Sequence, residues 1–120
     1  MINSKCSVCG SDPGFDRITP MIEDRFGVTP DFGCAGGCVT MVLELETGHV
    51  IHVNDARESG LRHIDRRSVA DGFSVQIWRD DDACAWGEDP ILTLTRYVDV
   101  AGLPDLIADA ISALLTARSM

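Results

Sequence analysis

The chain has few basic residues and almost no lysine. Its 120 residues include 19 acidic side chains against 10 basic ones, and the net charge is −9. Binding to nucleic acid requires clustered cations that neutralise phosphates and release counterions. Because acids outnumber bases in both halves of the sequence, the composition argues against a nucleic-acid partner.

The chain also lacks a long apolar run. A helix that spans a bilayer needs about 18 or more consecutive apolar residues, and no stretch approaches that length. The first residues, MINSKCSVCG, contain no apolar segment typical of a secretory signal. We therefore expect a cytoplasmic protein without a membrane partner.

No signature of a known catalytic site is present. The sequence contains no nucleophile elbow, HExxH zinc motif, phosphate-binding glycine loop or dinucleotide fingerprint. The glycine-rich segment at residues 33–38 has no predicted strand before it and no Lys-Ser/Thr after it. A catalytic cysteine beside a histidine is the enzymatic possibility that stays open. The absence of the other catalytic motifs favours a protein that is not an enzyme.

What the chain contains is sufficient for one folded domain. A domain typically has roughly 100–200 residues, and 45% of these residues are hydrophobic against 24% charged, unlike a disordered chain. Glycine and proline are concentrated near the N-terminus, with nine in residues 1–38 and seven in residues 39–120. We expect a single domain, 1–120, with a loop-rich, cysteine-rich subregion at 1–38 followed by a sheet and a C-terminal helix at 39–120.

Four of the five cysteines lie in this loop-rich subregion, in two closely spaced pairs. Cys6 and Cys9 are separated by two residues, and Cys34 and Cys38 by three. Such spacing lets both sulfurs of a pair face one cation, and four thiolates in a tetrahedron suit Zn²⁺. In a reducing cytoplasm, cysteines indicate metal ligands before disulfides. The spacing therefore predicts a zinc site that staples residues 1–38, with reduced or redox-active thiols and disulfides as the alternatives.

The segment KCSVCG resembles the first knuckle of zinc-ribbon and treble-clef proteins. The resemblance implies a structural four-cysteine zinc site whose ligands are Cys6, Cys9, Cys34 and Cys38, although the second pair departs from the usual two-residue spacing. The remaining 82 residues are similar to small uncharacterised domains of actinobacteria and their phages. The nine arginines against one lysine agree with a GC-rich bacterial or phage genome.

Four segments of the second part show the pattern of β-strands. Apolar residues alternate along 39–45, and a three-residue loop at 46–48 predicts a hairpin that pairs Leu43 with Ile51 and Met41 with Val53. A third strand follows the Asp71-Gly72 turn, and a fourth covers residues 91–98, which are rich in β-forming side chains. We expect an antiparallel sheet of about four strands.

Helices are predicted before and after these strands in the sequence. An apolar stripe at three- and four-residue spacing predicts an amphipathic helix over 103–117 that covers the sheet; its members are Leu103, Leu106, Ile107, Ala110, Ile111, Leu114 and Leu115. A short helix is expected from Pro20 to Phe26, with Thr19 as its cap and Gly27 as its stop. Residues 57–69 suggest another short helix with Leu61 and Ile64 inward.

The remaining polar residues of interest are histidines, a lone cysteine and an acidic run. His49 and His52 are three apart on a predicted strand and therefore point to opposite faces, although His49, beside the turn, is the best substitute for a zinc-binding cysteine. Cys84 is interpreted as a half-buried thiol in a loop, with a fifth metal ligand or a regulatory thiol as the alternatives. The run Asp80–Asp82 is interpreted as a solvated turn. His63 is expected to be structural.

Trp78 and Trp86 flank this acidic turn. Trp78 alternates against its apolar neighbours on the third strand, so it lies on the opposite face. Two interpretations stay open there: an exposed tryptophan ringed by acids, which is typical of an interface anchor, or a tryptophan covered by the C-terminal helix.

Taken together, the sequence predicts an α+β fold and a non-enzymatic, acidic, protein-binding accessory domain of bacterial or phage origin, stabilised by Zn²⁺. Its protein partner is unknown, with self-association as one form, and its acidic surface would steer it towards a basic patch. A thiol-based redox protein or small metal-dependent enzyme is the alternative.

Overall fold

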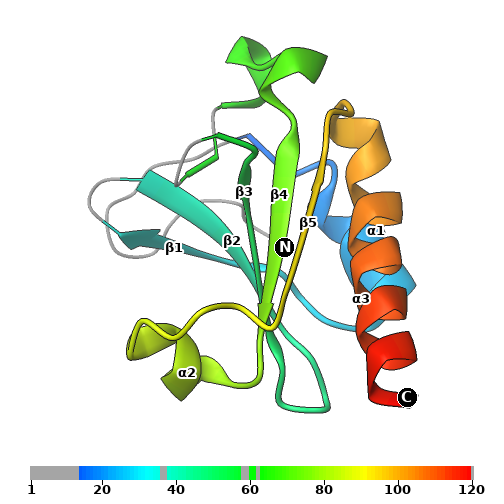
Figure 1. The fold of residues 1–120 in the computed structure, drawn as a ribbon. Helices are drawn as coiled ribbons and strands as arrows, with labels where there is room; N and C mark the ends of the chain where they lie inside the picture. The colour runs from blue at the N-terminus through cyan, green and yellow to red at the C-terminus, as the bar shows by residue number, and fades with distance from the viewer. Residues whose placement is uncertain (1–13, 36–37, 58–59, 62, 120) are drawn as a thin grey trace.

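The protein is an α+β domain built on a five-stranded antiparallel sheet (Figure 1). The computed structural model describes residues 14–35, 38–57, 60–61 and 63–119. The strands are β1 (Asp31–Ala35), β2 (Cys38–Glu44), β3 (Val50–Asp55), β4 (Phe73–Trp78) and β5 (Leu92–Arg96), and they lie side by side in chain order. The helices are α1 (Thr19–Phe26), α2 (Asp81–Ala85) and α3 (Leu103–Ser119), with 3₁₀ turns at Ile64–Arg66, Val69–Asp71 and Val100–Gly102.

The sheet has five strands rather than the four predicted. The additional strand is β1, which lies in the subregion expected to be loops and pairs antiparallel with β2. Among residues 31–33, the part of β1 whose side chains are described, Phe32 provides the buried apolar side chain. One such residue in a short segment produces no recognisable alternation, so β1 owes its conformation to pairing with β2.

The predicted hairpin register is confirmed. Met41 pairs with Val53 and Leu43 with Ile51, and all four side chains are buried. In the turn, Gly48 has a φ of 93°, which a residue with a Cβ rarely adopts. Glycine at this position therefore allows the tight connection that sets the register of the hairpin.

The predicted C-terminal helix is also confirmed, as α3. Leu103, Leu106, Ile107 and Ala110 are fully buried, while Leu115 at the end of the stripe is 52% exposed. The core lies between one face of the sheet and the two helices α1 and α3, which share that side (Figure 1). It includes side chains from the N-terminal subregion as well, namely Phe15, Ile18, Ile22 and Phe32.

Two local predictions need correction. Thr19 is the first residue of α1 rather than its cap, and its hydroxyl donates to the carbonyl oxygen of Phe15 at 2.9 Å. The helix stops at Gly27 as predicted, because Gly27 adopts the left-handed conformation and its N–H donates to the carbonyl of Glu23. The helix expected within 57–69 is only a 3₁₀ turn at Ile64–Arg66, although Leu61 is buried as predicted.

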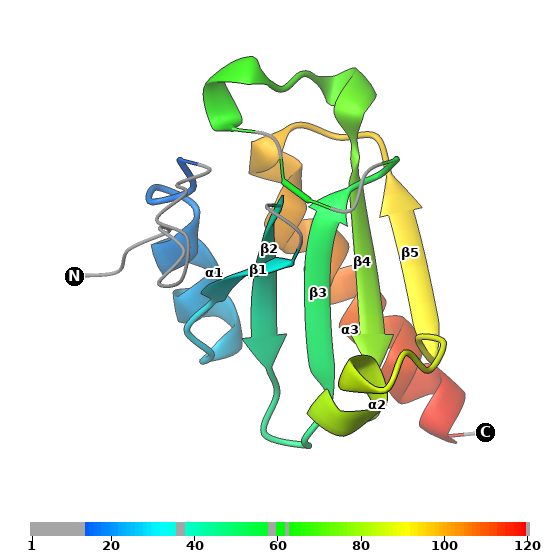
Figure 2. The same ribbon diagram turned by 90° about the vertical axis from the view of Figure 1, so that its left-hand side faces the viewer.

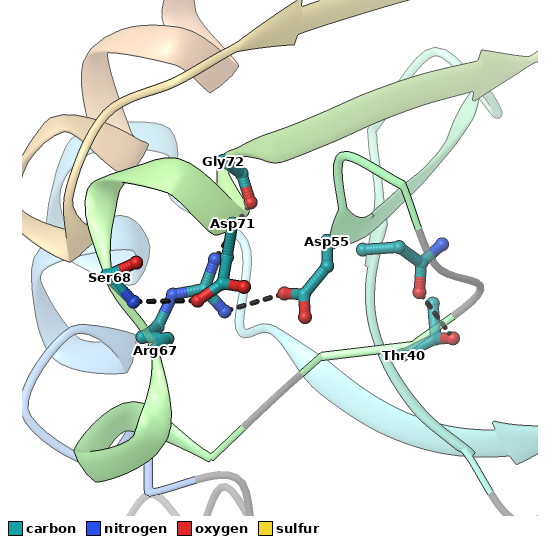
Figure 3. Close-up of polar contacts among 7 residues, drawn as sticks. Thr40, Asp55, Arg67, Ser68, Asp71 and Gly72 are labelled. Carbon is teal, nitrogen blue, oxygen red and sulfur yellow. Dashed lines mark hydrogen bonds and ion pairs between the residues drawn. The ribbon is translucent and has the colours of Figure 1, made fainter.

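A buried ion pair fastens the long connection between β3 and β4 (Figure 3). Arg67 Nη1 lies 2.6 Å from Asp55 Oδ1, and both side chains are only 3% exposed. Arg67 Nη2 also donates to the carbonyl of Gly72 at 2.8 Å, and the guanidinium lies 3.9 Å above the ring of Phe73. The pair thus joins the end of one strand to the start of the next.

Part of the N-terminal chain and the two hairpin glycines, residues 36–37, are not among the described residues. Cys6 and Cys9 fall in that part, so the zinc staple stays a prediction. Within the described ranges, no helix combines the length and apolar character needed to cross a bilayer.

We expect Arg67→Ala to lower the free energy of unfolding by about 3–5 kcal/mol, because it leaves the buried Asp55 carboxylate without its guanidinium. Urea denaturation measures the change. The control is Arg96→Ala, since Arg96 Nη1 lies 2.7 Å from Asp109 Oδ2 in an exposed pair. That variant should lose less than about 1 kcal/mol. Equal losses in the two variants would show that burial does not set the strength of the Arg67 pair.

Candidate binding face

The face of the sheet opposite to α1 and α3 carries mostly polar side chains. Strand pairing aligns Val42, His52, Gln76 and Thr93 in one row across the sheet, and Thr40, Asn54, Ser74 and Thr95 in the next. These side chains are half-buried or exposed, and Thr40 Oγ1 donates to Asn54 Oδ1 at 2.8 Å. Figure 2 shows this face with α2 in front of it and α3 behind the sheet. We call it the open face.

Helix α2 covers one end of the open face. Asp80 caps it, because its carboxylate accepts the N–H of Ala83 at 2.8 Å, and Asp81 and Asp82 follow in the first turn, where the helix dipole favours acids. The acidic run interpreted as a solvated turn is therefore the start of a helix. Ala83 is buried, so α2 packs on the sheet through a small side chain.

Trp78 lies beneath this helix rather than at the surface. It is on the opposite face from Phe73, Val75 and Ile77, as predicted, and is 9% exposed. Its indole N–H donates to the carbonyl of Glu88 at 2.9 Å, so the segment after β4 folds back over it. Both interpretations of Trp78 are therefore wrong. The side chain is not exposed, and α2 rather than the C-terminal helix α3 covers it.

Cys84 and His52 meet between α2 and β3. The Cys84 sulfur lies 3.6 Å from His52 Nε2 and 4.0 Å from Nδ1, and the imidazole is also stacked at 4.9 Å from the Trp78 ring. Cys84 is half-buried and forms no disulfide. The loop thiol of the sequence interpretation is thus a helical thiol with a histidine partner.

Burial sets the protonation of this pair. It lowers the pKa of His52, against a smaller effect of the Asp81 carboxylate. Burial also raises the pKa of the Cys84 thiol, and Asp81 adds to that rise. The resting pair at neutral pH is therefore a neutral imidazole beside a protonated thiol. It differs from the thiolate–imidazolium pair of cysteine proteases, but it places a proton acceptor next to a thiol.

An acidic groove adjoins the open face at its β1 edge. It has a volume of about 460 Å³ and is lined by Val28, Thr29, Pro30, Asp31, Val42 and Glu44. Val42 pairs with His52, so the groove lies beside the row that contains the imidazole. Its walls combine apolar side chains with two exposed carboxylates, those of Asp31 and Glu44.

The structure places two of the four predicted zinc ligands close together in the backbone. Cys34 pairs with Val39 and Ala35 with Cys38, so both cysteines flank the hairpin loop at 36–37. Cys6 and Cys9 lie outside the described residues. Within the described ranges, no group of three or more His, Cys, Asp and Glu side chains is arranged to hold a metal ion.

The proposed substitute ligand, His49, lies at the wrong end of the sheet. It follows β2, and its Nδ1 is 2.7 Å from Thr47 Oγ1 in the turn, whereas Cys38 begins β2. A strand of this length separates the two residues by roughly 20 Å, which is too far for a shared cation. His63 is at the same end as Cys38, because Leu61 donates its N–H to the carbonyl of Val39.

Comparison with known proteins gives no match, whether to a family model, a curated protein or a solved structure. The resemblance to zinc knuckles therefore depends on the cysteine spacing and KCSVCG alone.

The lowered pKa of His52 makes stability depend on pH. In the unfolded chain histidine has a pKa near 6.5, so below about that pH the unfolded state binds the proton before the folded state does. The free energy of unfolding should then fall as the pH decreases through about 6.5, by up to about 1.4 kcal/mol per unit from this group, until the folded state also binds the proton. Urea titrations should show a shallower fall in His52→Gln. Identical slopes in the variant and the wild type would contradict this assignment.

Proposed function

We propose that the chain is a non-enzymatic protein-binding domain that presents α2 and the adjoining open face to a basic segment of another protein. The observation that carries this proposal is the exposure of Trp86. Its side chain is 84% exposed, more than any other large hydrophobic residue among those described. Tryptophan is strongly enriched among the residues that dominate binding energy at protein interfaces.

The position of Trp86 supports a binding role because its surroundings hold it in place. It ends α2, and Gly87 directly after it has a φ of 75°, which turns the chain back towards Trp78. The bond from the Trp78 indole to the carbonyl of Glu88 fixes the other side of this turn. These contacts hold the backbone at Trp86, while its side chain stays exposed and available to a partner.

The charges around Trp86 indicate what kind of partner fits. Asp81, Asp82 and Asp89 are exposed near it in the chain, whereas Glu88 pairs with Arg79 at 2.7 Å. An arginine or lysine of a partner can stack on an indole face. The groove at the β1 edge offers apolar walls for the stem of a second basic side chain and carboxylates for its charged end. A second copy with the same net charge of −9 would be repelled, so the partner is a different, basic protein.

We expect Trp86→Ala to weaken binding of an arginine- and leucine-containing heptapeptide by about 30-fold, the size typical of a buried anchor. Fluorescence anisotropy of the labelled peptide measures the affinity. Met21→Ala is the matched control, because Met21 is 52% exposed but lies on α1, behind the sheet.

The same peptide with glutamate in place of arginine should not bind. Added salt should lower the affinity of the arginine peptide, because it slows association of the peptide with the protein. Wild-type affinity in Trp86→Ala, salt-independent association or no binding by the wild type would each contradict the proposal.

We also propose that Cys6, Cys9, Cys34 and Cys38 hold a structural zinc ion. The β1–β2 pairing supports this, since it brings the second pair to one hairpin end. The chain path supports it as well: Gly14 lies against Ile64 and His63, and Leu61 is bonded to Val39, next to Cys38. Cys9 precedes Gly14 by five positions in the chain, and such a segment can span up to about 17 Å. The first pair can therefore reach the second.

Protein purified without added metal should contain about one zinc per chain. Cys34→Ser should lose the metal and lower stability, because a four-thiolate site needs all its ligands. Cys84→Ser is the control, and elemental analysis should find the metal retained in it. If thiol titration finds every cysteine reduced and accessible and the protein carries no metal, the zinc site does not exist.

A further inference from the structure

The contact between Cys84 and His52 has no part in the protein-binding proposal, and it has the components of a reactive thiol site. The sulfur is half-buried and lies 3.6 Å from Nε2 of an imidazole. Both groups sit at the junction where a five-residue helix rests on the sheet. We propose that Cys84 is a site of reversible modification by small cationic disulfides, that His52 takes up the thiol proton, and that the adduct displaces α2 from the sheet.

The reaction is a thiol–disulfide exchange between Cys84 and a disulfide RS–SR. The thiol proton passes to His52 Nε2 as the Cys84 sulfur attacks one sulfur of the reagent, so a new S–S bond forms and the S–S bond of the reagent breaks. The leaving thiolate RS⁻ then takes the proton from the imidazolium and departs as RSH. Cys84 is oxidised and the reagent reduced, without any other oxidant.

The environment explains why the base is needed. Burial and Asp81 keep Cys84 protonated at neutral pH, and burial keeps the imidazole neutral and able to accept a proton. Of the other groups on this face, Trp78 and Gln76 on β4 do not titrate, and Glu44 on β2 lies in the next row. Reaction at neutral pH therefore depends on proton transfer within the pair.

The charge near the thiol selects the reagent. Asp81 acts electrostatically on both Cys84 and His52, and Asp82 lies beside it in the same helical turn. A cationic disulfide is attracted to this region and an anionic one is repelled.

The structural consequence follows from the way α2 is held. Ala83 is its buried contact, and the Trp78–Glu88 bond lies just beyond it. A helix with so few buried groups belongs to the least stable part of a fold. An adduct on Cys84 occupies the space against His52, so α2 moves away and Trp78 becomes exposed to water.

The test uses the full chain and the cationic disulfide cystamine, with dithiodiglycolate as its anionic counterpart. Peptide mapping by mass spectrometry measures the rate of adduct formation at Cys84 separately from the other cysteines. At about pH 7, His52→Asn should react at least about ten-fold more slowly than the wild type, and near pH 10 the two rates should converge because the thiolate then forms unaided. Cystamine should react faster than dithiodiglycolate at low salt.

The displacement of α2 is measured by fluorescence in Trp86→Phe, where Trp78 is the remaining one of the two tryptophans. Cystamine should shift its emission to longer wavelength, reductant should reverse the shift, and the same protein with Cys84→Ala should show none. Equal rates for His52→Asn and wild type at pH 7 overturn the role of His52. Faster reaction with the anionic reagent overturns the charge selection, and modification without an emission shift overturns the displacement. These outcomes do not depend on peptide binding, so they are distinct from failure of the proposed function.

Discussion

The fold depends on burying one face of a sheet whose strands alternate in side-chain direction. Both long helices lie on the same side, where α3 provides a continuous apolar stripe and α1 adds Ile22. Once that side is filled, the alternate residues of each strand face away from the core. They are polar in most places, and the apolar exceptions at one end, Val50 and Trp78, are buried next to α2. The open face is thus a direct consequence of where the helices pack, and α2 is present because two apolar side chains on that face require cover.

This arrangement gives α2 two roles that compete. It has to stay on the sheet to cover Trp78 and to hold Trp86 in a defined position, yet it is short and contributes one small buried side chain, that of Ala83. Its acidic first turn favours the helix through the dipole and supplies the charge that would attract a basic partner. Burial raises the pKa of the Cys84 thiol, and the Asp81 carboxylate of this turn adds to that rise. A change in the position of α2 would therefore alter the exposed anchor and the thiol pair together.

The sequence predicted the elements in which many residues repeat one pattern. Helix α3 repeats its apolar spacing over several turns, and the β2–β3 hairpin combines alternation with a glycine turn, so both the element and the register were correct. Strand β1 has one large apolar residue in its sequence, Phe32, which is too little signal for any periodicity. The pair of Cys84 and His52 is separated by 32 residues in the chain and depends on a five-residue helix. The sequence signal for this helix was Asp80, a residue type that caps helices. Asp80 begins a run of three acids that is equally typical of a turn, so the signal did not identify a helix.

The two ends of the sheet differ in what they contribute. At one end, the Asp55–Arg67 pair, the bond from Leu61 to Val39 and the hairpin that carries Cys34 and Cys38 fasten connections between strands. At the other end lie α2 and the β2–β3 turn (Figure 2). The acidic groove is at this end too, since Glu44 at the end of β2 lines it. Strand β3 joins them, since it begins beside Trp78 and ends at Asp55. Groups this far apart contribute to stability almost additively. The fastened end can therefore keep the strands paired if α2 is displaced at the other end, as proposed above.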